Sequence, residues 1–87
     1  MNLEWEPSTQ EQFNKLIDKV PAVMQKIARD AVLKKLQALV SQDNRLTITE
    51  KDLVDAFFEA TPFGFHGPMK SDMETIGLDY TQYGYDK

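Results

Sequence analysis

The chain has 87 residues, a net charge of −4 and no cysteine. This length allows one small domain of marginal stability, which docking onto a partner or dimerisation would raise. The lack of cysteine excludes disulfides, thiolate catalysis and cysteine-held zinc or iron–sulfur sites within the chain. The acidic N-terminal sequence is not typical of a signal peptide, and no apolar run has the length of a membrane span. We therefore expect a cytoplasmic protein without membrane contact.

Charge is distributed unevenly along the sequence. Residues 21–42 carry four bases and one acid, whereas residues 50–87 carry eight acids and three lysines. The four bases, Lys26, Arg29, Lys34 and Lys35, form a candidate basic face. This face is either neutralised by the acidic half of the chain or free to bind an acidic partner. Because the whole chain is acidic, we do not expect it to bind nucleic acid.

The N-terminal third predicts an extended lead-in and one helix. Residues 1–7 alternate apolar and polar side chains, and we expect Trp5 to cover one end of a small core. Ser8 and Glu11 have the spacing of a capping box, which predicts a helix over 9–19. Its apolar face has a spacing of three and four residues and consists of Phe13, Leu16, Ile17 and Val20.

The longest amphipathic stretch predicts a second helix over 21–41. Pro21 suits the first turn of a helix. Proline lacks a backbone N–H, and an N–H at that position would have no hydrogen-bond partner within the helix. We expect this helix to be central, since its apolar stripe is wide enough to be covered from two sides. The stripe consists of Met24, Ile27, Ala28, Ala31, Val32, Leu36, Leu39 and Val40, and is widened by Val23, Leu33 and Ala38.

A turn and a short extended segment lead into a third helix. The alternating residues 46–49 predict the extended segment, and Thr49 with Asp52 predicts a cap for a helix over 50–60. The Pro- and Gly-containing sequence of 62–69 predicts a loop. Only one further turn is expected after it, over 71–76, with Gly77 as its stop. An irregular tail follows.

The fold prediction is an all-α domain of three helices, with a short extended segment before the third. Residues 1–60 form the predicted domain, and residues 61–87 form an aromatic C-terminal extension. This extension either presents a docking surface or folds back over a core that three short helices leave open.

Candidate ligand or partner contacts lie in the segment 62–69. His66 is the only histidine and can act as an acid, a base or an axial metal ligand. Without a carboxylate or nucleophile nearby, a structural role is the alternative. Three apolar neighbours complete this candidate site: Phe63, Phe65 and Met69.

No other pattern indicates catalysis or a metal centre. Asp52, Asp55 and Glu59 share one side of a helix, which a divalent cation can use, but a solvated acidic face explains them equally simply. No phosphate-binding glycine loop and no nucleophile elbow is present. We predict no catalytic residue, no metal site and no activity for the chain alone.

The order of several short motifs resembles a known family. These are Trp5 with Pro7, Val20-Pro21 at a helix start, Ala28-Arg29, Leu46-Thr47-Ile48-Thr49, and Ala56 in the last helix. Over residues 3–60 this order is similar to the small C-terminal domain of the B subunit of light-independent protochlorophyllide reductase. Residues 61–87 have no counterpart in that pattern.

The resemblance implies a non-catalytic accessory or protein-interaction domain of a chlorophyll-pathway oxidoreductase. Its partner would be a reductase or another tetrapyrrole-pathway subunit, and no cofactor would be held by this chain itself. Two alternatives stay open. One is a small tetrapyrrole-binding protein that uses the 62–69 loop, and the other is a histone-like dimer that binds DNA, suggested by the T-I-T segment before a short last helix.

Overall fold

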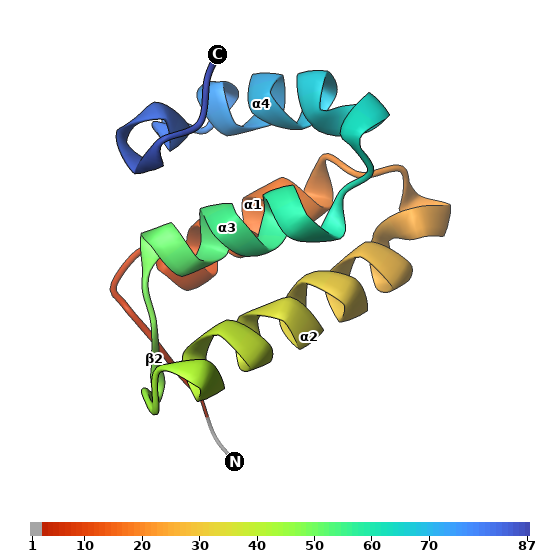
Figure 1. The fold of residues 1–87 in the computed structure, drawn as a ribbon. Coiled ribbons are helices and arrows are strands. Elements are labelled where there is room, and N and C mark those ends of the chain that lie inside the picture. Colours follow the sequence, from red (N-terminus) through yellow and green to blue (C-terminus); the bar gives the residue numbers. More distant parts are fainter. Residues whose placement is uncertain (1–2) are drawn as a thin grey trace.

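Helices make up most of the computed structural model, which describes residues 3–87 (Figure 1). The elements are β1 (Glu4–Trp5), α1 (Thr9–Asp18), α2 (Gln25–Gln42), β2 (Thr47–Ile48), α3 (Glu50–Ala60) and α4 (His66–Thr75), with short 3-10 helices at Ala22–Met24, Phe63–Phe65 and Tyr80–Tyr83. The predicted all-α class is confirmed. Two residues of the predicted lead-in, 1 and 2, lie outside the described residues.

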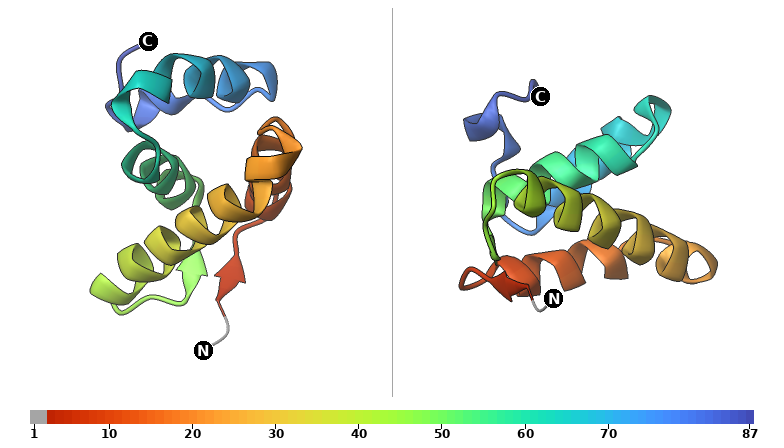
Figure 2. Two further views of the ribbon diagram at one scale, coloured as in Figure 1. Left: turned by 90° about the vertical axis from the view of Figure 1, so that its right-hand side faces the viewer. Right: turned by 60° about the horizontal axis from the view of Figure 1, so that its bottom comes forward.

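Helix α3 occupies the centre of the molecule. It packs against α2, α1 and the C-terminal 3-10 helix, and α4 crosses the side away from α2 (Figures 1 and 2). Leu53, Val54 and Ala56 have no exposed surface, and Phe57 and Phe58 have very little. The prediction that the second helix is central was therefore wrong. The shorter α3 holds this place because six of its 11 residues are buried and only Lys51 and Glu59 are exposed.

Helix α2 is buried along a narrower stripe than predicted. Val32, Leu36 and Val40 point into the core, whereas Met24 and Ile27 are 47% and 62% exposed. The helix also begins at Gln25 instead of Pro21, after a 3-10 turn. Its neighbours cover only one side of α2, so the rest of the predicted stripe faces solvent.

The N-terminal segment is held by a parallel pairing with β2. Glu4 pairs with Thr47 and Trp5 with Ile48, and the Trp5 ring lies 5.3 Å from that of Phe13. The predicted capping box at Ser8 does not form. Ser8 has a φ of 72° and makes no side-chain cap hydrogen bond, because the tight turn before α1 places it in the left-handed region.

The C-terminal segment is a folded part of the core, which corrects the prediction of a loop and an irregular tail. It contains α4 and buries Met69, Met73, Leu78 and Tyr80 in the same apolar cluster as the first three helices. Pro68 lies in the first turn of α4, where a proline costs no hydrogen bond. Gly77, with a φ of 79°, follows the end of this helix, as its predicted stop role requires. Burial of apolar side chains has outweighed the loop-like local composition.

Leu36→Asp tests the placement of the core. Leu36 is fully buried, so an aspartate there should lower the free energy of unfolding by roughly 4 kcal/mol, most of what such a domain has. Urea unfolding followed by circular dichroism measures the loss. Gln37→Asp, at the exposed neighbouring position, is the matched control and should change stability little. Equal stability of the two variants would contradict the fold.

Candidate functional site

Two connections of the same design lie at one end of the molecule. Each begins with a proline in an extended conformation, continues as a 3-10 helix of three residues and leads directly into an α-helix. In both, the proline carbonyl accepts a hydrogen bond from the N–H three residues later, at 2.8 and 2.9 Å. We call Pro21–Met24 and Pro62–Phe65 the first and second proline turns. They lie on the right-hand side of Figure 1 and face the viewer in the left view of Figure 2.

The proline turns expose large apolar side chains. Val23 is 86% exposed, and Phe63 and Phe65 are 88% and 64% exposed. Together with Met24 and Ile27 at the start of α2, they form a set that we call the apolar end. A single exposed apolar side chain needs no explanation. These five form two groups, one at each proline turn, and the left view of Figure 2 shows the two turns on opposite sides of this end.

His66 ties the second proline turn to α3. Its Nε2 lies 2.9 Å from the carbonyl oxygen of Thr61 and 3.2 Å from that of Phe58. Because carbonyls only accept hydrogen bonds, Nε2 carries the proton and donates to the end of α3. The imidazole also meets the Phe58 ring edge-on, with 5.1 Å between centroids. These contacts favour a structural role for the histidine.

The candidate contacts of the 62–69 segment thus separate in the fold. Phe63 and Phe65 are exposed, His66 is half-buried, and Met69 is only 8% exposed and belongs to the core. The separation follows from the elements, because Phe63 and Phe65 belong to the 3-10 helix before α4. His66 and Met69, three residues apart within α4, lie on the same face of that helix.

The four bases predicted as one face point in different directions. Arg29 lies over the Phe13 ring, 5.4 Å from its centroid, and Lys26 forms an exposed ion pair of 3.0 Å with Asp30. Lys34 and Lys35 are exposed and have no ion pair among residues 3–87. Among residues 3–87, Lys34 and Lys35 are thus the two of these four bases with neither an ion pair nor a ring contact.

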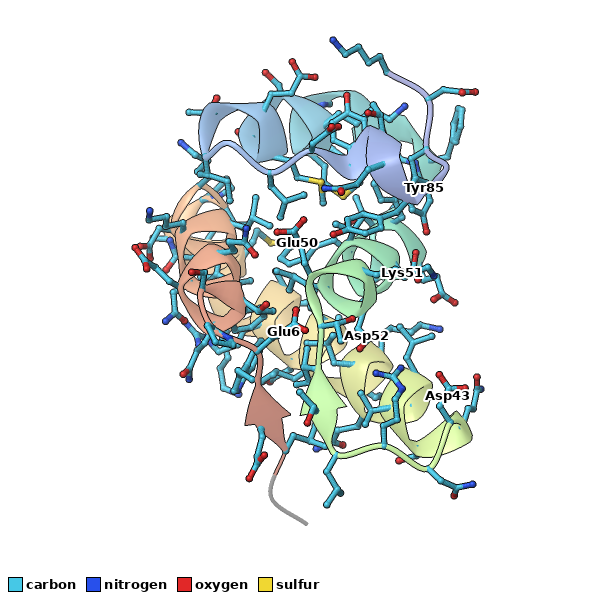
Figure 3. All side chains as sticks on the ribbon, turned by 90° about the vertical axis from the view of Figure 1, so that its left-hand side faces the viewer. Glu6, Asp43, Glu50, Lys51, Asp52 and Tyr85 are labelled. Atoms are coloured by element: carbon cyan, nitrogen blue, oxygen red, sulfur yellow. The ribbon has the colours of Figure 1, made fainter. Side chains whose placement is uncertain are left out.

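The opposite end of the molecule is polar, and Glu50 links three segments there (Figure 3). Its carboxylate accepts hydrogen bonds from Gln12 of α1 at 2.9 Å and from Tyr83 of the C-terminal segment at 2.6 Å. Tyr85 stacks on Phe58 and donates to Asp55. Burial and these hydrogen bonds to carboxylates raise the pKa of Tyr83 and Tyr85 above its usual range. Both phenols are thus protonated donors that hold the chain end on α3.

A second polar cluster joins the end of α2 to the start of α3. Asp52 caps α3 by accepting from the N–H and hydroxyl of Thr49, at 2.9 and 3.0 Å. It also accepts two hydrogen bonds from the Arg45 guanidinium, at 2.8 and 2.9 Å. Desolvation raises the pKa of Asp52, but the hydrogen bonds from Arg45 and Thr49 outweigh it and leave this pKa below its ordinary value.

This cluster lines a shallow cavity of about 410 Å³, and both cationic side chains of its lining are already paired with carboxylates. The five N–H groups of Arg45 are shared among Asp43, Asp52 and the Thr47 carbonyl. Lys51, at the rim, pairs with Asp55 at 2.8 Å. The cavity is therefore part of the connection between α2 and α3.

A metal-binding cluster and a membrane-spanning helix are both absent from residues 3–87. No group of three or more histidine, aspartate or glutamate side chains there is arranged to hold a metal ion. No helix in the same residues combines the length and apolar character that crossing a bilayer requires.

Three residues of the apolar end were missed by the sequence prediction, which placed Met24 and Ile27 in the core stripe and added Val23 to it. A signal was present in the similarity of VPAVMQ and TPFGFH, each a proline-led turn before a helix. The first pattern was interpreted as an ordinary helix start.

A comparison of the sequence with known protein families gives a match over nearly the whole fold. The chain belongs to the family described as Protein of unknown function (DUF2621), whose profile matches residues 2–85. The match includes both proline turns, α4 and the C-terminal 3-10 helix. Neither a curated protein nor a solved structure matches the chain.

The family match overturns the resemblance to protochlorophyllide reductase. Nothing links this family to that enzyme, so the resemblance was wrong, and the expected chlorophyll-pathway role and reductase partner have no support. The motifs behind the resemblance are a proline before a helix and a capped T-I-T segment. Both are local helix-start chemistry, which unrelated helical domains share.

Asp52→Asn tests the connection between α2 and α3. The folded-state pKa of Asp52 lies below the unfolded value, so its stabilisation is complete above about pH 4 and is lost as the pH falls through the folded-state pKa. The variant should be about 2 kcal/mol less stable at pH 7, and the difference should narrow on acidification. Urea unfolding between pH 7 and 2.5 measures both. Asp18→Asn, at an exposed position, is the control, and a gap that stays constant with pH would contradict the prediction.

Proposed function

We propose that this chain is a non-catalytic protein-interaction domain that docks through its apolar end. The observation that carries the proposal is the exposure of Val23, Phe63 and Phe65 on two proline turns at the same end. Apolar and aromatic side chains are enriched in the buried centres of protein interfaces, where they gain most from leaving water. The cytoplasmic location predicted from the composition remains part of this proposal.

The turn conformations support docking. Both prolines restrict φ, and the Phe58 ring and the histidine hydrogen bonds hold the second turn against α3. A surface held in place before binding loses little conformational entropy when a partner covers it. The polar contacts also support docking at the apolar end. At the opposite end, the hydrogen-bond donors and carboxylates are already engaged with each other within the fold.

The other functions predicted from sequence have no contact in residues 3–87 that favours them. A tetrapyrrole needs an open imidazole nitrogen beside an apolar pocket, and Nε2 of His66 is engaged with α3. DNA binding needs several free bases on one face, and among residues 3–87 only Lys34 and Lys35 of the bases on α2 have neither an ion pair nor a ring contact.

A photo-crosslinking amino acid at Phe65 tests the docking surface in the cells from which the chain comes. We expect an adduct with one other protein, and we expect Val23→Asp in the same chain to abolish it. The matched control carries the crosslinker at Gln10, which is exposed on α1 away from the apolar end. Val23, Phe65 and Gln10 are all exposed, so each substitution should change the free energy of unfolding, measured by thermal unfolding, by no more than about 0.5 kcal/mol. Adducts of equal yield from both positions, or from neither, would reject the proposal.

A further inference from the structure

Helix α2 has a second apolar feature that extends away from the apolar end. Its outward side, opposite the core residues Val32, Leu36 and Val40, carries six exposed residues at alternating spacings of three and four. We call this row the outward seam. It consists of Met24, Ile27, Ala31, Lys34, Ala38 and Ser41.

Alternation of three and four residues is the spacing by which one helix contacts another along its whole length. Met24 and Ile27 provide large apolar side chains at one end of the seam. Ala31 and Ala38 leave room for the axis of a neighbouring helix to come close. Over the 18 residues of α2 the seam is about 27 Å long, the length of a partner helix of similar size.

The outward seam is positively charged. Lys34 lies within it and Lys35 beside it, and neither has an ion pair among the described residues. Lys26, next to Ile27, is already neutralised by Asp30 at 3.0 Å. A partner that lies along the seam therefore meets two free ammonium groups near its middle.

This charge distinguishes between two kinds of occupant. A second copy of the chain would bring the same lysines to the contact, and like charges would oppose each other across it. A helix with carboxylates near Lys34 and Lys35 would complement them. Steering by such carboxylates would also raise the rate of association at low salt.

We propose that the outward seam binds an amphipathic helix of a different protein, with acidic residues facing Lys34 and Lys35. The inference rests on the proposed function and names the chemistry of the partner. The apolar residues of that helix contact Met24 and Ile27, and its carboxylates fix the register along α2.

Selection from displayed helical peptides of about 21 residues tests this inference on the full chain. Apolar residues are fixed at the heptad a and d positions, and the other positions vary. We expect selected peptides to be enriched in aspartate and glutamate over lysine and arginine. A representative peptide should bind the double variant Lys34→Glu/Lys35→Glu about tenfold more weakly, as expected from two exposed ion pairs.

The matched control is Lys15→Glu/Lys87→Glu, which changes the net charge equally but away from α2. It should keep the affinity of the original chain, and Ile27→Asp should abolish binding. The inference is overturned if no peptide is selected, if the selected peptides lack acidic enrichment, or if the control variant loses affinity equally.

Two measurements address the other occupants of the same surface. Sedimentation of the chain alone should show a monomer, and a dimer abolished by Ile27→Asp would overturn the inference in favour of a second copy. Cosedimentation with phosphatidylglycerol vesicles should show no binding, and binding lost in the same variant would overturn it in favour of a lipid surface.

Crosslinking distinguishes failure of this inference from failure of the proposed function. With the crosslinker at Ala31 in place of Phe65, we expect the same adduct in cells. An adduct from Phe65 without one from Ala31 would overturn the seam as the docking path and leave the apolar end as an interaction surface.

Discussion

The carboxylate of Asp52 is the contact on which the arrangement of the helices depends. It caps α3 through Thr49 and holds the Arg45 guanidinium with two hydrogen bonds, so it joins the start of the central helix to the turn after α2. Only 6% of Asp52 is exposed, and an unpaired charge at such a place would be costly. Four good hydrogen bonds offset that cost. Since β2 lies within the same connection, its pairing with β1 depends on this carboxylate as well.

The molecule is organised with specific polar contacts at one end and exposed apolar groups at the other. Glu50, Asp52 and Asp55 hold α1, α2 and the C-terminal tyrosines at the start of α3. The end of α3 leads into the second proline turn, whose phenylalanines face solvent. A domain of this size has a small core. Apolar residues left outside that core are most simply explained by contact with a partner.

Several local features were predictable because they depend on neighbouring residues only. The Thr49–Asp52 capping box, the stop at Gly77 and the core face of α1 are set by spacings of three or four residues. The capping box at Ser8 had the same sequence signal and failed, because the turn before α1 placed Ser8 in a left-handed conformation. Helix α4 was missed for the opposite reason. Its Gly and Pro content indicates a loop, and burial of Met69 and Met73 against α3 makes it a helix.

By itself, the sequence determined the helical class, the boundaries of α3 and its cap, since periodicity and capping act over a few residues. It also excluded chemistry that depends on cysteine. Only the tertiary structure decided which side of α2 is buried. An apolar stripe indicates which residues can be buried, but it does not indicate which of them have neighbours that bury them. The same holds for the candidate site. Val23 and Ile27 are apolar residues of the kind that usually lie in a core. They are exposed because α1 and α3 pack on the other side of α2.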